Sequence, residues 1–205
     1  NRFEYSQLLA QGFRIGVDAD LTLLLRDPAA ALRTVPGFGC YRTVEETLAS
    51  IDQLVAAHPT LASRVDIGDS WEKTRNPASG YDLQVLKLTN SAIPGPKPRL
   101  FVVGALHARE YSTAETVMRF GEWLLARYPT DADVRWMLDQ HELHLLPQAN
   151  PDARKKAEAG LMWRKNVNEA YCGATSNQRG ADLNRNFPFE WGAHNGSSGA
   201  ACDES

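Results

Sequence analysis

The sequence predicts an α/β fold in which helices flank a mixed central sheet. Helical and extended patterns alternate between residues 41 and 147, and such alternation is typical of α/β proteins. A run of seven apolar or small residues at 100–106 marks one buried strand. The chain's 205 residues suffice for one sizeable core. Its 43% apolar and 23% charged content excludes a disordered tail or a fibre.

The first 39 residues are predicted to be a linker or the tail of an upstream segment. Residues 6–14 fit a short helix, and residues 14–25 have a patchy alternation that fits a strand. Proline and glycine residues then interrupt the chain repeatedly between positions 28 and 39.

A capping box at Thr43–Glu46 predicts the start of the first long helix. Apolar residues follow at helical spacing until Pro59 ends the pattern. Two extended runs, 64–71 and 81–89, come next and are separated by a turn-rich stretch.

The strand at 100–106 is predicted to be buried on both faces, because polar residues do not alternate with its apolar ones. A second capping box, Ser112–Glu115, predicts the start of the helix that follows. Residues 130–133 open another short helix, and residues 142–147 fit a further strand. Residues 148–205 are expected to be mostly loop, and polar loops after strands are where such sheets place their sites.

Charge and hydropathy exclude two classes of partner. The formal net charge is −3, and lysine and arginine are scattered along the chain. This predicts no nucleic-acid or anionic-membrane footprint. No apolar run approaches the ~20 residues that a membrane-spanning helix needs.

The motif His107-Ala-Arg-Glu110 lies where the predicted strand ends and the next helix begins. An imidazole and a carboxylate three residues apart on such a bend can converge on one metal ion. Nitrogen and oxygen ligands suit zinc, which takes three protein ligands in a catalytic site. By itself the motif fits a strand-end histidine beside a solvated glutamate better than it fits a metal site.

Two later segments add donors for an anion. The loop 182–187 reads Asp-Leu-Asn-Arg-Asn-Phe and is suited to hold a carboxylate by charge-assisted hydrogen bonds. The segment Met162-Trp-Arg-Lys165 puts a guanidinium beside an aromatic ring. Each segment alone also fits solvated loop charges.

Together and in this order, the motifs resemble the zinc metallocarboxypeptidases of the carboxypeptidase A and T type. The resemblance runs from about Tyr41 to the last residue. It rests on four motifs, namely Gly104–Glu110, Asn150–Asp152, Trp163–Lys165 and Asp182–Asn186. It implies that residues 40–205 are the N-terminal half of a catalytic domain, so that the chain looks truncated. Residues 1–39 would then be a linker or the end of a pro-region.

The resemblance also implies the catalytic roles. His107 and Glu110 correspond to two of the three ligands of one zinc ion. Arg164 corresponds to the arginine that polarises the scissile carbonyl and stabilises the oxyanion. In this family a zinc-activated water attacks the last peptide bond, with a glutamate as general base.

The implied substrate is the C-terminus of a peptide or protein. Asn184 and Arg185 correspond to the pair that holds its terminal carboxylate, and Arg109 to an arginine that lines the substrate path. We expect His107 and Glu110 to lie at a strand's C-terminal end and to face Asn184 and Arg185 across a cleft.

The family's third zinc ligand and its general base have no counterpart in this sequence. The missing histidine would follow Asn186 by some tens of residues. The other four histidines are assigned structural roles. His194 fits an exposed loop, and His58 fits a helix end. His141 and His144 are predicted to lie on opposite faces of one strand. We therefore expect these 205 residues to be inactive alone and to expose apolar surface on one edge of the sheet.

Cys172 and Cys202 fall where pancreatic-type relatives carry a disulfide, which implies a possible bridge between them. Two reduced cysteines are the alternative at this point, and Cys40 has no partner on this interpretation. A bridge would favour a secreted or periplasmic protein, as does the resemblance.

Two other functions stay open. Zinc-dependent deacylases of the aspartoacylase type share an H-x-x-E start and a D-x-N-R loop, and would cleave N-acyl amino acids instead of peptides. Some relatives of carboxypeptidases lose a ligand or the general base and only bind peptide tails. The segment Trp163–Lys165 favours the peptidase over the deacylase.

Overall fold

A computed structural model describes residues 9–12, 35–176, 178–191 and 202–203. The strand predicted at 14–25 and His194 lie outside the described residues, as does most of the helix predicted at 6–14.

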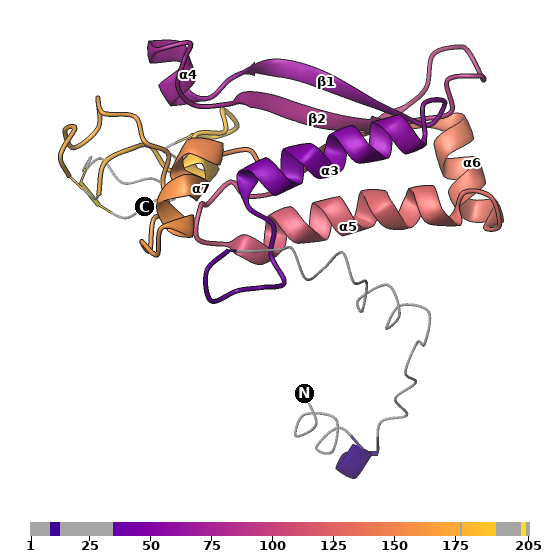
Figure 1. Cartoon of the computed structure of the whole chain (residues 1–205), viewed down its shortest axis with the longest axis horizontal. Helices are drawn as coiled ribbons and strands as arrows, with labels where there is room; N and C mark the ends of the chain where they lie inside the picture. The colour runs from indigo at the N-terminus through magenta and orange to yellow at the C-terminus, as the bar shows by residue number, and fades with distance from the viewer. Residues whose placement is uncertain (1–8, 13–34, 177, 192–201, 204–205) are drawn as a thin grey trace.

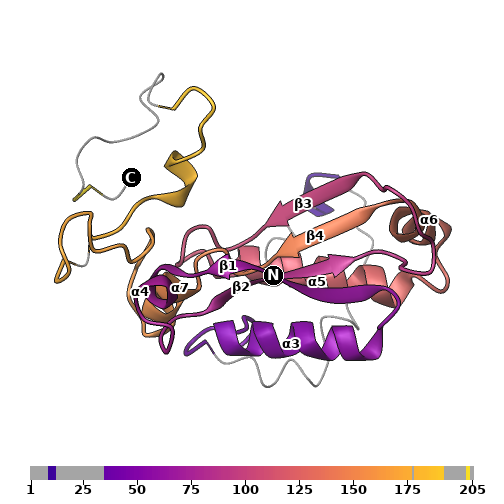
Figure 2. The same cartoon turned by 90° about the horizontal axis from the view of Figure 1, so that it is seen from above.

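The described sheet is mixed and has four strands. They are β1 (Ala62–Asp69), β2 (Asp82–Leu88), β3 (Arg99–Val103) and β4 (Glu142–Leu146). Their order across the sheet is β1-β2-β4-β3. The pairs β1/β2 and β2/β4 are antiparallel, whereas β3 and β4 are parallel. The predicted α/β fold with a mixed sheet is confirmed, and Figure 2 shows β3 and β4 side by side.

Two long helices and several short ones accompany the sheet. They are α3 (Val44–Ala57), α4 (Trp71–Arg75), α5 (Tyr111–Arg127), α6 (Ala132–Gln140), α7 (Pro151–Glu158) and the 3-10 helix η2 (Leu183–Arg185). In Figure 1, α3 and α5 run alongside one another, α6 lies at one end of the molecule, and α7 lies at the other.

The main core lies between these helices and one face of the sheet. Leu86 pairs with Leu145, and Leu88 with Leu143, so four leucines of β2 and β4 point the same way. Gly121 of α5 lies so close to them that a Cβ there would be 3.0 Å from the Leu145 side chain. Helices α3, α5 and α6 and the start of β1 supply the rest of this core: Ile51, Leu61, Ala62, Val117, Met118, Leu124, Leu125, Val134 and Leu138.

The opposite face of the sheet bears charged side chains that link neighbouring strands. Glu142 of β4 accepts hydrogen bonds from Lys87 Nζ of β2 at 2.6 Å and from Arg99 Nε of β3 at 3.0 Å. The His144 imidazole lies 3.1 Å from the same carboxylate. His141, in contrast, is the residue after α6 and stacks edge-on against Trp136, so the prediction that it shares a strand with His144 is wrong.

The prediction that residues 100–106 form a strand buried on both faces is also wrong. β3 ends at Val103, and the side chains of Leu100 and Phe101 are 52% and 53% exposed. Within the described part of the chain, β3 is an edge strand that pairs only with β4. Among the described residues, no further strand pairs with the free edge of β3. β3 is therefore the exposed apolar edge that the sequence led us to expect.

Capping was predicted correctly for one helix and wrongly for another. The box at Thr43–Glu46 is confirmed, since both of its reciprocal hydrogen bonds are present. The box at Ser112–Glu115 does not form, because α5 already begins at Tyr111 with Glu110 as its N-cap residue. Glu115 instead accepts a hydrogen bond from Arg119 Nε at 2.9 Å.

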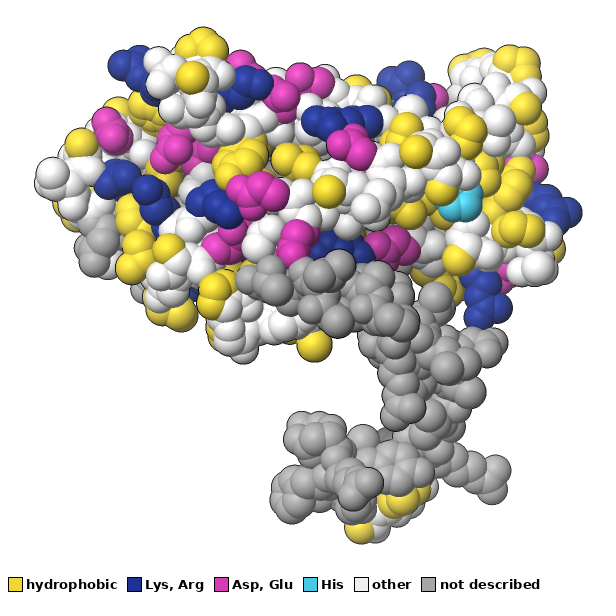
Figure 3. Space-filling model, in the orientation of Figure 1, with side chains coloured by type: hydrophobic (Ala, Val, Ile, Leu, Met, Phe, Trp, Pro, Cys, Tyr) yellow, Lys and Arg dark blue, Asp and Glu magenta, His cyan; other side chains and the backbone are white. Residues whose placement is uncertain are grey.

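Basic and acidic side chains are interspersed on the face shown in Figure 3. Among the described residues, no helix has the length and apolarity needed to cross a membrane.

Candidate functional site

The bend between β3 and α5 positions the His107–Glu110 motif. Gly104 donates its N–H to the Leu146 carbonyl, and a Cβ at Gly104 would lie only 2.9 Å from the Thr113 carbonyl oxygen. Ala105 follows with a φ of 50°, a region that L-residues rarely adopt. Its N–H is held by the Thr113 hydroxyl at 2.9 Å. These contacts turn the chain sharply, directly before His107.

Both ring nitrogens of His107 face carboxylates. Nδ1 lies 2.9 Å from Glu110 Oε1, and Nε2 lies 2.9 Å from Asp182 Oδ1. The imidazole is buried, whereas the Glu110 side chain is 43% exposed. A neutral imidazole has one N–H and can donate to only one of these oxygens. The other contact requires either a second proton or a cation between the nitrogen and the carboxylate.

Asp182 connects the bend to the later loop. It is almost fully buried and caps η2, where its Oδ1 also accepts the Asn184 N–H at 2.9 Å. Its Oδ2 accepts from Arg164 Nε at 2.9 Å. Burial by itself would raise the pKa of Asp182, but the hydrogen bonds from His107, Arg164 and the Asn184 N–H outweigh it and lower the pKa. The carboxylate therefore stays charged and orients both the imidazole and the guanidinium.

Arg164 lies against the candidate metal-binding pair. Its Nη1 is 3.7 Å from Glu110 Oε1, and its side chain is 17% exposed. The backbone carbonyl of Arg164 accepts the Ala108 N–H at 3.2 Å. The guanidinium and the His107–Glu110 pair are thus held together by side-chain and main-chain contacts.

The Asn150-Pro-Asp152 motif fixes the frame around the site. The Asn150 amide donates to the carbonyls of Leu106 and Lys165, both at 3.1 Å. It thereby links the bend to the segment that bears Arg164. Asp152 accepts the Ser70 hydroxyl at 2.7 Å and so ties α7 to the segment that leads into α4. This part of the motif is structural.

His107 and Glu110 fit two of the positions around a zinc ion. They offer one nitrogen and one oxygen, the donor types that zinc takes in proteins. The Asp182 carboxylate contacts Nε2 of His107 and so fixes the tautomer that carries its proton on Nε2. Nδ1 is then available to bind a metal ion, and carboxylates orient ligating histidines in this way. Within the described ranges no cluster of three or more His, Cys, Asp or Glu residues can hold a metal ion by itself.

The residues predicted to bind substrate lie on η2 and on the bend that bears His107. Asn184 and Arg185 belong to η2, beside Asp182, and the Arg185 guanidinium donates to the Asn184 carbonyl at 2.9 Å. Arg109 projects from the bend and its Nη1 lies 3.5 Å from the Met162 carbonyl oxygen. All three predicted substrate-binding residues therefore sit on segments that touch the bend or Asp182.

The cysteines and the remaining described histidines make none of the side-chain contacts given above for His107 and Glu110. A disulfide joins Cys172 to Cys202, and Cys40 is a free, exposed cysteine. His58 is the C-cap residue of α3. These positions give none of the described histidines besides His107 a contact with the site.

The sequence alone predicted no separate role for Asp182 or Asn150. Both belong to the motifs on which the resemblance rests, but their partners lie far away in the chain. His107, for example, is separated from Asp182 by 75 positions. The one local signal was the aspartate two residues before Asn184, a spacing that suits a side-chain cap on a backbone N–H.

Known proteins share both the sequence and the fold. Residues 47–205 match the zinc carboxypeptidase family. Carboxypeptidase A2 of Mus musculus is 32% identical over 170 residues, which cover 81% of this chain and 37% of the mouse protein. A zinc carboxypeptidase of Saccharothrix mutabilis subsp. capreolus is 30% identical over 198 residues, which cover 90% of this chain and 43% of that protein.

Among solved structures, carboxypeptidase A of Helicoverpa armigera has a TM-score of 0.68 and 26% identity, covering 100% of this chain and 50% of that one. Thrombin-activatable fibrinolysis inhibitor shares the fold, with a TM-score of 0.70 at 22% identity. The chain spans half or less of the length of these relatives. Because the family match covers most of its residues, the chain belongs to the zinc carboxypeptidase family.

Proposed function

We propose that the full-length natural protein containing this chain is a zinc-dependent carboxypeptidase that hydrolyses the last peptide bond of a peptide or protein. The observation on which this rests is the buried His107, whose two ring nitrogens each face a carboxylate at 2.9 Å. That arrangement favours a cation between His107 and Glu110, with Asp182 as the orienting group behind the imidazole.

Zinc held by His107 and Glu110 would supply Lewis-acid activation of a water molecule and of the scissile carbonyl. Arg164, 3.7 Å from Glu110, is close enough to donate to the same carbonyl oxygen as negative charge develops there. Its hydrogen bond to Asp182 keeps the guanidinium in place before substrate arrives, so little reorganisation is needed during the reaction.

The exopeptidase specificity is assigned to Asn184 and Arg185. An amide and a guanidinium on one short helix can hold a terminal carboxylate by charge-assisted hydrogen bonds. Arg109, on the bend beside the metal pair, would line the path of the preceding residues. A carboxypeptidase requires such an anchor, because it must recognise the free end of the chain.

Within the described residues no group of three or more His, Cys, Asp or Glu side chains could hold a metal ion. We therefore propose that the third zinc ligand and the general base come from outside these residues and that the 205-residue chain alone is inactive. The Cys172–Cys202 disulfide favours an oxidising compartment, so we also propose that the protein is secreted or periplasmic.

The test measures release of C-terminal amino acids from peptides by the full-length protein, together with bound zinc. We expect one zinc per molecule and a release that a chelator abolishes. His107→Ala should lose both zinc and activity, and Arg164→Gln should keep zinc but lose roughly 10²–10³-fold in kcat. His58→Ala is the matched control and should retain both properties, because His58 caps a helix away from the site.

Two results would contradict the proposal. Cleavage of N-acyl amino acids without release from peptides would identify a deacylase. Binding of peptide tails without cleavage, in a protein with no zinc, would identify a non-catalytic relative.

A further inference from the structure

A cavity of about 250 Å³ lies next to Arg164 and carries positive charge on several sides. Its lining residues are Arg109, Met162, Trp163, Arg164, Lys165, Gln178 and Arg179. Four of the seven are cationic and none is acidic. A cavity of this composition favours an anionic occupant.

All four cations have partners within the protein, and two of them make short hydrogen bonds. Arg164 donates to Asp182 at 2.9 Å. Lys165 is buried, and its Nζ donates to the Asp203 carbonyl at 2.5 Å. These two side chains add positive charge to the cavity. However, the Arg164 Nε and the Lys165 Nζ already donate to acceptors within the protein.

Arg179 differs from them in how its guanidinium is held. The group lies over the Trp163 ring, with Cζ 5.2 Å from the ring centroid, and one Nη donates to the Ala174 carbonyl. Its buried Nε has no hydrogen-bond partner among the described residues. Stacking fixes the plane of the guanidinium, and a planar guanidinium matches the two oxygens of a carboxylate.

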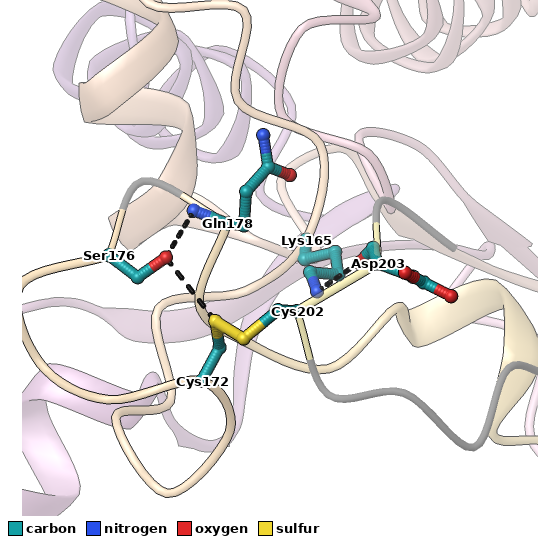
Figure 4. Close-up of a disulfide and its surroundings, with 6 residues drawn as sticks. All are labelled: Lys165, Cys172, Ser176, Gln178, Cys202 and Asp203. Atoms are coloured by element: carbon teal, nitrogen blue, oxygen red, sulfur yellow. Dashed lines mark hydrogen bonds between the residues drawn. A yellow bond between two sulfur atoms is a disulfide. The ribbon is translucent and has the colours of Figure 1, made fainter.

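The loop that bears Arg179 is fastened on both sides. Gly180 follows, and a Cβ there would collide with the Asn166 carbonyl at 1.9 Å, so the backbone is packed tightly against Asn166. On the other side, the Gln178 N–H donates to the Ser176 hydroxyl at 3.0 Å, next to the disulfide. Figure 4 shows Gln178 and Lys165 near this disulfide. The cavity wall is therefore preorganised.

We propose that this cavity receives an acidic side chain of the substrate upstream of the scissile bond, and that Arg179 is the residue that selects it. The inference rests on the proposed carboxypeptidase function. The terminal carboxylate is assigned to Asn184 and Arg185, which are not among the residues that line this cavity. Arg164 and Arg109, which we assign to the scissile carbonyl and to the path of the preceding residues, both line the cavity, so the proposed substrate path runs along it.

The experiment uses the full-length protein and pairs of peptides that differ only by Glu or Gln at one of the first four positions upstream of the scissile bond. At one position we expect kcat/KM to be about tenfold higher for Glu, the effect of one charge-assisted hydrogen bond. Arg179→Gln should reduce this ratio to near one, and Arg179→Lys should restore part of it. Added salt should lower the wild-type ratio, because the cavity is open to solvent.

Arg75→Gln is a matched control. Arg75 also stacks on a tryptophan, with Cζ 5.3 Å from the Trp71 ring centroid, but it does not line this cavity. The variant removes the same charge and should leave the Glu/Gln ratio unchanged. An equal loss in both variants would overturn the proposal, as would a wild-type ratio near one at all four positions.

The two proposals fail in distinguishable ways. If no peptide is cleaved, the proposed function fails, and calorimetric binding of the same peptides still tests the cavity. Tighter binding of a Glu peptide that depends on Arg179 but not on Arg75 would then support an anion-selective cavity. Equal binding of Glu and Gln peptides would overturn it.

Discussion

Asp182 is the residue on which the geometry of the site depends most. It is the common partner of His107, Arg164 and the Asn184 N–H, and its side chain is 2% exposed. Such orienting carboxylates typically account for about 10–100-fold in metal affinity. We expect Asp182→Asn to weaken zinc binding by that factor, because an amide cannot hold the imidazole and the guanidinium equally well.

Zinc competition against a chromophoric chelator measures this effect. Asp52→Asn, at an exposed ion pair with Arg64, should leave zinc affinity unchanged. An Asp182→Asn protein that binds zinc like the wild type would show that the carboxylate only supports the fold.

The motifs in the sequence identified the residues of the site but not all of their contacts. His107 and Glu110 are close in sequence, so their convergence was predictable from the bend. The contact of His107 with Asp182 spans 75 positions and depends on how η2 packs against the bend. No local pattern predicts a contact over such a sequence separation, so the role of Asp182 could not be predicted from its motif.

At the scale of elements, the strongest regular patterns were predictable and the short segments were not. The Thr43–Glu46 box and the strands near 81–89 and 142–147 follow from local capping and alternation. Helix α7 was missed because it is short, and its buried face includes Asp152 and Arg154 in place of an apolar stripe. Its stability comes from tertiary contacts such as those of Asp152 with the segment leading into α4.

The charged face of the sheet leads to a pH-dependent stability. The hydrogen bond from Lys87, followed by that from His144, lowers the pKa of Glu142 to about 2 from a usual 4.5. Because the folded-state pKa is depressed, the stabilisation is complete above pH 4.5 and is lost as the pH falls toward 2. We expect Glu142→Gln to destabilise the protein by about 1–3 kcal/mol at neutral pH.

Urea unfolding of both proteins at pH 7, 4 and 3 measures this difference, which should shrink between pH 4.5 and 2. Asp52→Asn is the control, because the exposed Asp52–Arg64 pair should contribute less than about 1 kcal/mol. A difference for Glu142→Gln that is constant from pH 7 to pH 3 would show that packing, and not charge, makes its contribution.

At the scale of the whole molecule, β3 is an exposed edge of the described sheet. Leu100 and Phe101 lie on opposite faces of this strand and are both half exposed, and their strand pairs only with β4 among the described residues. The other edge strand, β1, also bears a half-exposed residue, Ile67, but a register irregularity between Asp66 and Asp69 interrupts its edge. Irregular edges resist pairing with another chain, whereas a regular apolar edge favours it.

We therefore expect the 205 residues, produced alone, to self-associate through β3 at micromolar concentrations. Phe101→Lys should shift the sedimentation profile toward monomer, because a charge on a strand edge opposes pairing. Ile67→Lys, the same change on β1, should leave the profile unaltered. If both variants shift the profile toward monomer to the same extent, the loss of association is a general effect of added charge and does not identify β3 as the contact. If neither shifts the profile, β3 is not the contact.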